Sequence, residues 1–193
     1  MAQRSRAAGE AVDCPVPVPT LVVVSGPPGA GKTTLAHALG RALPCPAICR
    51  DEIKEGMAHA TPAYTPTPGD ALARRTYIAF FAVVALLVDA GVSVVAEAAF
   101  QDRLWRQGLT PLLDRATVRL VQCTVDPAIA RDRHARRLGR DPRSRAAHDD
   151  LRLSSSPEPF VALTLPVRTL RVETTDGYAP SLPEIVAFVG AAP

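Results

Sequence analysis

The residues with the clearest chemical potential form a glycine-rich segment that carries one lysine and two threonines. It matches the pattern G-x-x-x-x-G-K-[ST] and consists of Gly26, Pro27, Pro28, Gly29, Ala30, Gly31, Lys32, Thr33 and Thr34. Glycines let the backbone curl so that successive N–H groups point inward and bind phosphate oxygens. Lys32 is expected to reach the β- and γ-phosphates of ATP, and the Thr33 hydroxyl to ligate Mg²⁺. The segment predicts a triphosphate–magnesium site, but by itself it does not separate a kinase from a GTPase, a motor or a switch.

A second group of polar residues follows the short apolar run at 47–49 and includes Arg50, Asp51 and Lys54. Ligands of doubly wound sheets collect at the carboxyl ends of strands, so Asp51 is expected to face the γ-phosphate. A carboxylate there can accept a proton from an attacking hydroxyl or hold a magnesium-bound water. Arg50 and Lys54 are predicted to bind an anionic or polar acceptor. Alternatively, Asp51 caps the following helix, which is compatible with catalysis.

A third feature is the concentration of positive charge between residues 131 and 145, which hold seven of the 22 basic residues. Arg133 and Arg137 are spaced i, i+4 and therefore share one helical face. They are predicted to belong to a lid at about 131–150 that closes over the triphosphate and neutralises charge developed during transfer. Residues 139–150 lack apolar periodicity and are expected to form an exposed, mobile loop. The alternative is a solvated helix surface in an arginine-rich protein.

The elements that must position these groups can be read from the apolar pattern. Strands are expected at 21–25, 47–49, 92–97, 118–125 and 167–172, and helices at 32–43, 51–57, 70–90, 102–115, 127–138 and 183–189. The run at 21–25 is continuously apolar, which suits a central parallel strand that is covered on both faces. Strands that alternate with helices predict an α/β protein with a five-stranded parallel sheet and helices on both faces.

Size and composition favour one compact domain. The chain has 193 residues, of which 47% are hydrophobic, enough for a substantial core. We expect a single domain at 20–193, preceded by a flexible, proline-rich arm at 1–19. The formal charge of +3 permits an anionic ligand without indicating nucleic acid.

The cysteines and the apolar segments bear on the cellular compartment. Four cysteines without a C-x-x-C pair indicate reduced thiols rather than zinc or disulfides. The most apolar stretch, at 78–88, is too short to span a bilayer and predicts a buried helix, so no membrane association is expected. No targeting signal is visible, and a cytoplasmic location is expected.

Taken together, the motifs resemble a known group of enzymes. The segments at 25–34 and 49–54, with the helix that carries Arg133 and Arg137, are similar to the zeta-toxin, polynucleotide-kinase-like and chloramphenicol-phosphotransferase-like group of small P-loop kinases. The resemblance covers about residues 20–190. It implies a three-layer P-loop NTPase fold with ATP and Mg²⁺ as cofactors, Asp51 as general base, and both arginines in the lid.

One position departs from that group. Similar kinases tend to end the third strand with Asp and small polar residues, whereas this chain continues from Glu97 into Ala98, Ala99 and Phe100. Glu97 is expected either to order magnesium waters or to hold the acceptor. Its apolar neighbours indicate an acceptor pocket that is less polar than usual.

The acceptor-binding insert is expected at about 57–77. Its polar candidates are Tyr64, Arg74, Arg75 and Tyr77, beside His59 and the proline-rich loop. A proline-stiffened loop over a pocket suits a small-molecule hydroxyl, such as that of a metabolite, sugar or antibiotic. A polynucleotide 5′-hydroxyl is the second choice, because nucleic acid normally needs aromatic platforms along a basic track and only 5% of residues are aromatic. Trp105 is interpreted as a packing residue. A third possibility, from another class, is an ATP-binding switch with no phosphoryl acceptor.

Overall fold

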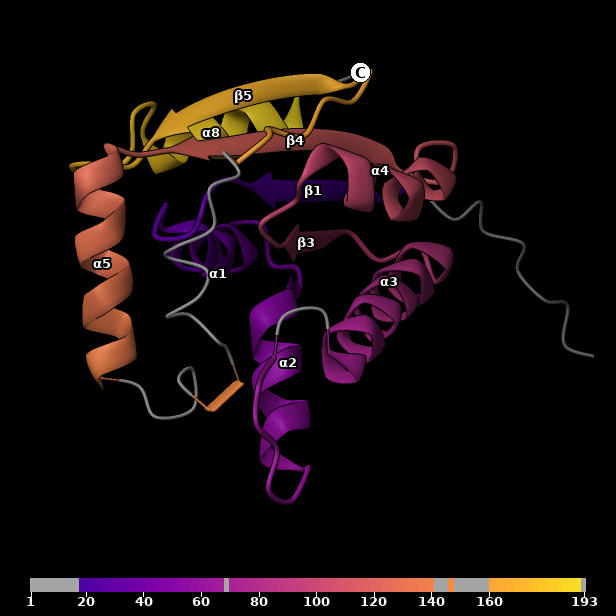
Figure 1. The fold of residues 1–193 in the computed structure, drawn as a ribbon. Helices are drawn as coiled ribbons and strands as arrows, with labels where there is room; N and C mark the ends of the chain where they lie inside the picture. Colours follow the sequence, from indigo (N-terminus) through magenta and orange to yellow (C-terminus); the bar gives the residue numbers. More distant parts are fainter. Residues whose placement is uncertain (1–17, 68–69, 141–145, 148–159, 192–193) are drawn as a thin grey trace, which may run out of the picture.

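The structure, a computed structural model, describes residues 18–67, 70–140, 146–147 and 160–191 (Figure 1). The predicted arm at 1–19 lies almost wholly outside the described residues. The strands are β1 (Thr20–Ser25), β2 (Ala47–Cys49), β3 (Val94–Glu97), β4 (Thr117–Thr124) and β5 (Arg168–Glu173). They form one sheet in the order β2-β3-β1-β4-β5, and every neighbouring pair is parallel. The predicted five-stranded parallel sheet is therefore confirmed.

The helices follow the predicted alternation with the strands. They are α1 (Lys32–Ala42), α2 (Arg50–His59), α3 (Ala71–Asp89), α4 (Asp102–Leu109), the 3₁₀ helix η1 (Thr110–Leu112), α5 (Pro127–Arg140) and α8 (Leu182–Gly190). Asp70 begins α3 as expected, because its carboxylate accepts a hydrogen bond of 2.6 Å from the Ala73 N–H. The predicted interruption near Pro111 is the change from α4 to η1.

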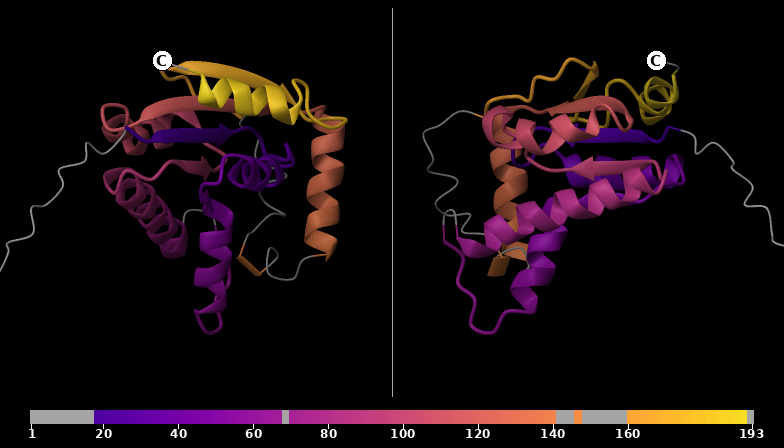
Figure 2. Two further views of the ribbon diagram at one scale, coloured as in Figure 1. Left: turned by 180° about the vertical axis from the view of Figure 1, so that it is seen from behind. Right: turned by 90° about the vertical axis from the view of Figure 1, so that its right-hand side faces the viewer.

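The sheet is covered on both faces, and β1 explains why its sequence does not alternate. Leu21 and Val23 face a core that includes Phe80 of α3, whereas Val22 and Val24 face a core that includes Leu35 of α1. These four side chains of β1 are each at most 1% exposed. The two layers of helices on either side of the sheet can be followed in Figure 2. The three-layer arrangement expected from the sequence is confirmed.

Helix α3 supplies most of the aromatic packing. Phe80 is fully buried, and Trp105 of α4 lies against it with ring centroids 5.9 Å apart, so the interpretation of Trp105 as a packing residue is confirmed. Tyr77 lies 4.9 Å from Phe81 and 5.1 Å from Trp105, centroid to centroid. Its ring therefore packs toward α4, and its role in the acceptor insert stays a prediction.

Two further observations concern α3 and the segment after α5. By length and composition α3 is apolar enough to cross a membrane, but its Phe80 face packs on the sheet. The expectation of an exposed loop at 139–150 was wrong at Ala147. This residue is fully buried against Ala58 and Leu72, because a small apolar side chain fits between α2 and α3. Residues 141–145 and 148–150 lie outside the described part of the chain.

Candidate active site

The glycine-rich segment joins β1 to α1 and is pressed against two neighbouring elements. A Cβ atom at Gly26 would lie 2.5 Å from the Cys123 carbonyl oxygen of β4, and one at Gly29 would lie 2.3 Å from the Ala130 carbonyl oxygen of α5. The φ angles are 150° at Gly26 and 78° at Gly29, which residues with a side chain rarely adopt. Both glycines are therefore required for the loop to curl beneath α5.

Lys32 is the first residue of α1 and is 8% exposed. Its Nζ donates a hydrogen bond of 3.0 Å to the Pro27 carbonyl oxygen, across the loop. The ammonium group thus lies over the concave side of the loop, where the N-terminus of α1 adds the positive end of its dipole. This is the arrangement expected for binding the phosphates of a nucleotide.

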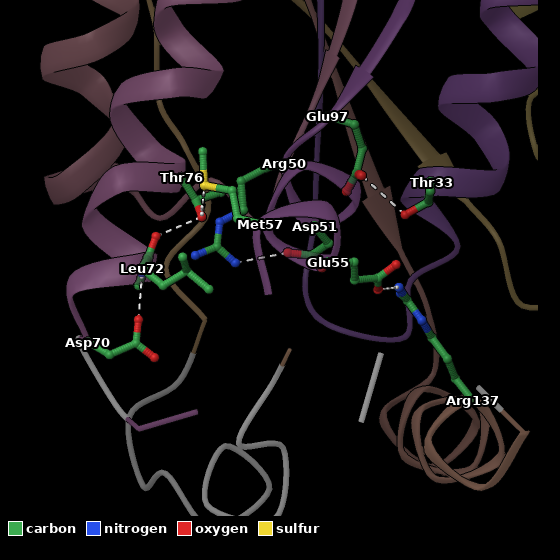
Figure 3. Close-up of polar contacts among 11 residues, drawn as sticks. Thr33, Arg50, Asp51, Glu55, Met57, Asp70, Leu72, Thr76, Glu97 and Arg137 are labelled. Atoms are coloured by element: carbon green, nitrogen blue, oxygen red, sulfur yellow. Dashed lines mark hydrogen bonds and ion pairs between the residues drawn. The ribbon is translucent and has the colours of Figure 1, made fainter. Parts of the chain in front are cut away.

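Thr33 and Glu97 form the part of the site suited to a cation (Figure 3). Strand β3 lies next to β1, and the Thr33 Oγ1 donates a hydrogen bond of 3.1 Å to Glu97 Oε2. Glu97 is 2% exposed, and burial raises the pKa of its carboxyl, although the nearby Lys32 charge opposes this effect. A threonine of the phosphate-binding loop and a carboxylate from a neighbouring strand are what P-loop proteins use to hold Mg²⁺. The residues present therefore fit that ion.

Asp51 lies in the first turn of α2, directly after β2 (Figure 3). Its Oδ1 accepts a hydrogen bond of 2.9 Å from an Arg50 terminal nitrogen, and its side chain is 39% exposed. The Asp51 charge also contributes to the raised pKa of Glu97, which indicates that the two carboxyls are near each other. The residue that caps α2 is Cys49, so the alternative role of Asp51 as the cap is not what the structure has.

Lys54, which the sequence assigned to the acceptor, is only 6% exposed. It belongs to a polar group with Tyr64 and Asp70. The Tyr64 hydroxyl donates to Asp70 Oδ2 at 2.5 Å, and burial together with this bond raises the pKa of the tyrosine. Burial opposes ionisation of Asp70, yet the Tyr64 hydroxyl, backbone N–H donors and the Lys54 charge lower its pKa. Tyr64 and Asp70 therefore pair with each other, and Lys54 contributes positive charge near Asp70.

A pocket of about 370 Å³ lies beside this polar group, between α2, the loop after it and Ala146. The residues lining it are Glu55, Ala58, His59, Thr61, Ala63, Tyr64 and Ala146. Tyr64 thus occupies the predicted insert region and borders a real cavity. Arg74 lies one turn into α3 and is exposed.

The two arginines of α5 have different partners rather than closing together over the phosphates. Arg133 donates to the carbonyl oxygens of Thr174 and Thr175, both at 2.9 Å. Arg137 forms an ion pair of 3.0 Å with Glu55 of α2 (Figure 3). The i, i+4 spacing correctly places both arginines on one face of α5. It does not reveal that Arg133 contacts the loop after β5 whereas Arg137, one turn later, contacts α2.

The loop after β5 forms a second pocket of about 280 Å³ beside the glycine-rich segment, lined by Gly31, Thr34, Arg133, Thr174, Gly177 and Tyr178. Thr174 is 3% exposed, and its hydroxyl lies 3.1 Å from the Ala30 carbonyl oxygen and 3.0 Å from that of Thr124. The sequence gave no sign that Thr174 holds the glycine-rich loop. Glu55 was also missed, and nothing in its sequence context signals a partner 82 residues away.

The parallel sheet, the glycine-rich loop and the Thr33–Glu97 pair define a P-loop nucleotide-binding protein of the α/β NTPase fold. The chain matches the family AAA_33, described as an AAA domain, over residues 21–156, and it belongs to that family. A comparison with curated proteins gave no match.

Solved structures share the fold over most of the chain. A protein from Chloroflexus aurantiacus named a "putative kinase" has a TM-score of 0.77 and 25% identity, with 89% of this chain and 97% of that one covered. A sugar kinase from Janibacter sp. has a TM-score of 0.63 and 19% identity, with 92% and 97% covered. A chain of the Pnkp1/Rnl/Hen1 RNA repair complex has a TM-score of 0.54 and 18% identity, with 77% and 50% covered. The resemblance to small P-loop kinases is therefore confirmed for the fold.

Proposed function

We propose that this chain is an ATP-dependent kinase that transfers the γ-phosphoryl group to a hydroxyl group of a small molecule. The observation that carries the proposal is the position of Asp51, a half-exposed carboxylate at the carboxyl end of β2, beside the partly buried Thr33–Glu97 pair. A nucleotide switch needs a phosphate site and a metal site. An additional carboxylate open to solvent next to them is what a transfer to a hydroxyl requires.

Each group has a defined task in this reaction. The loop N–H groups and Lys32 bind the β- and γ-phosphates. Thr33 and Glu97 would hold Mg²⁺, which would neutralise charge on the phosphate oxygens. Asp51 accepts the proton of the acceptor hydroxyl as its oxygen bonds to the γ-phosphorus. The bond from that phosphorus to the β–γ bridging oxygen breaks, and ADP leaves. Arg137 supplies positive charge from α5 on the α2 side of the site.

The acceptor is proposed to bind on the α2 side of the site, near Arg50 and Tyr64. Arg50 is positioned by Asp51, and its buried Nε has no hydrogen-bond partner among the described residues. The neighbouring pocket of about 370 Å³ has a volume typical of small-molecule sites. The likeness to a sugar kinase supports a polyol or sugar-like acceptor, and the cavity favours this class over a polynucleotide strand.

The test is a mass-spectrometric screen of the purified chain with ATP and Mg²⁺. The panel contains sugars, polyols, other metabolites, hydroxylated antibiotics and an RNA oligonucleotide with a free 5′-hydroxyl. We expect one small-molecule class to gain a phosphoryl group in the presence of the wild-type chain and not of Lys32→Ala. Phosphorylation of the RNA alone would replace this proposal with the polynucleotide kinase. ATP binding without transfer to any member would favour the switch.

A further inference from the structure

Three side chains that the proposed reaction does not use meet at the start of α2. They are His37 on the second turn of α1, Cys49 at the end of β2, and Glu52 in the first turn of α2. His37 Nε2 lies 2.7 Å from Glu52 Oε1 and 3.8 Å from Cys49 Sγ. One ligand atom from each residue falls within a group whose members are all within 4.8 Å of one another.

We propose that His37, Cys49 and Glu52 form a binding site for one thiophilic divalent cation, of which Zn²⁺ is the best match. Imidazole, thiolate and carboxylate are the ligands that zinc prefers, whereas Mg²⁺ takes oxygen ligands and not sulfur. Zinc bonds of 2.0 to 2.3 Å in a tetrahedron hold the ligand atoms about 3.3 to 3.6 Å apart. The sulfur–nitrogen distance of 3.8 Å exceeds this range by about 0.2 Å, and the histidine and glutamate atoms need to separate by about 0.6 Å.

The surroundings allow an ion to enter and favour positive charge. The side chains of His37 and Glu52 are 40% and 46% exposed, while Cys49 is 2% exposed and closes the inner side. Two carboxylates lie near the Cys49 sulfur: Glu52 belongs to the proposed site, and Glu97 of β3 is the register partner of Cys49 in β2. The same negative surroundings attract a cation, and when the sulfur–metal bond forms the thiol proton is released to solvent. A fourth position remains for water.

The test is metal binding by the full chain after chelator treatment. Titration with Co²⁺ should give one equivalent bound and a thiolate-to-cobalt charge-transfer band in the near ultraviolet. Zn²⁺ should then displace Co²⁺ and abolish the band. Cys49→Ser should lose the band and bind at least about tenfold more weakly. His37→Gln should keep the band and bind more weakly, which preserves the test if the serine variant folds poorly.

The matched control is Cys45→Ser, which alters a half-buried thiol in the turn before β2. It should bind metal as the wild type does. A wild-type chain without a thiolate band, or a band that persists in Cys49→Ser, would overturn the site. Circular dichroism of each variant shows whether a loss of binding reflects unfolding. The readout is independent of phosphoryl transfer.

A second, independent observation concerns the outer face of α3, which runs along the outside of the molecule (Figures 1 and 2). Ile78 is 61% exposed, Leu86 is 68% exposed, and Ala82 between them is also exposed. Arg75 and Asp89 extend this stripe by three residues at each end, and both are exposed. Residues at 75, 78, 82, 86 and 89 fall within one narrow sector of the helix.

This spacing is symmetric about Ala82, and opposite charges stand at the two ends. We infer that α3 pairs antiparallel with α3 of a second copy around a two-fold axis through Ala82. Ile78 then lies opposite the partner's Leu86, and Arg75 opposite the partner's Asp89, which within its own chain is bound by Arg115. A two-fold interface must be self-complementary, and this stripe meets that condition in the spacing of its apolar residues and in the opposite charges at its ends. The small residue at the axis lets the helices approach closely.

Sedimentation velocity of the full chain from about 1 to 500 μM tests this pairing at the affinities expected for a small interface. The wild type should shift from monomer to dimer across the series. Ala82→Glu, which places like charges together at the axis, should remain monomeric. Val161→Glu, at a different apolar position that is 56% exposed, should behave as the wild type does. A monomer throughout, dimerisation of Ala82→Glu, or binding to lipid vesicles without self-association would overturn the inference.

Discussion

Thr174→Val tests whether the loop after β5 holds the glycine-rich segment in place. The wild-type hydroxyl is buried and reaches the Ala30 carbonyl oxygen at 3.1 Å and the Thr124 carbonyl oxygen at 3.0 Å. The Thr124 oxygen keeps the Thr174 backbone N–H at 2.9 Å after the change. Ala30, by contrast, loses a side-chain donor in a buried position.

The cost follows from that difference. Leaving one buried acceptor without its donor costs about 1–2 kcal/mol, and valine has nearly the shape of threonine, so little else changes. For a domain of this size the expected fall in melting temperature is about 2–8 °C. If the lost stabilisation affects only the glycine-rich loop, the dissociation constant of ATP should rise by up to about tenfold for each 1.4 kcal/mol lost.

Thermal unfolding and calorimetric ATP titration measure the two effects on one preparation. The control is Thr169→Val on β5, where an exposed hydroxyl donates to the Val167 carbonyl oxygen at 3.1 Å. It should change stability by less than about 0.5 kcal/mol. A Thr174→Val protein that is as stable as the control and binds ATP as tightly would refute the role given to Thr174.

Three further outcomes are expected. Because burial raises the pKa of Glu97, its charged form opposes folding, and the stability of the nucleotide-free protein should fall as pH rises through that pKa. Glu97→Gln should make the melting temperature less dependent on pH and abolish the stabilisation by ATP that depends on Mg²⁺. Arg137→Ala breaks a partly exposed ion pair with Glu55, so the free energy of unfolding should change by less than about 1 kcal/mol, whereas the rate of phosphoryl transfer should fall. Phe80→Ala should cost about 3–5 kcal/mol in chemical denaturation, with Ile78→Ala, 61% exposed, as its control.

Local chemistry accounts for what the sequence predicted well. The run at 21–25 is apolar on both faces because β1 is covered on both faces, and the glycine-rich loop is fixed by positive φ angles that few residues adopt. Such constraints act within a few residues of the chain. They are therefore visible in the sequence. For the same reason the sequence predicts the order of strands and helices along the chain and the nucleotide side of the site.

Contacts between distant segments account for what it did not predict. Thr174 meets Ala30 across 144 residues, and no residue type or spacing announces that bond. Lys54 was assigned to an acceptor because of its charge, yet the packing of α2 against the start of α3 buries it beside Asp70. Helical spacing identifies which residues share a face, but it does not identify what packs there.

The central claim is that Asp51 turns a nucleotide site into a phosphoryl-transfer site. Once an acceptor is known, the transfer rate and the ATP dissociation constant of Asp51→Asn should be measured together, with Asp114→Asn, an exposed residue before β4, as control. We predict a transfer rate lower by about 10²–10⁴-fold and unchanged ATP binding, because only the proton acceptor is lost. Transfer at the wild-type rate would contradict the account.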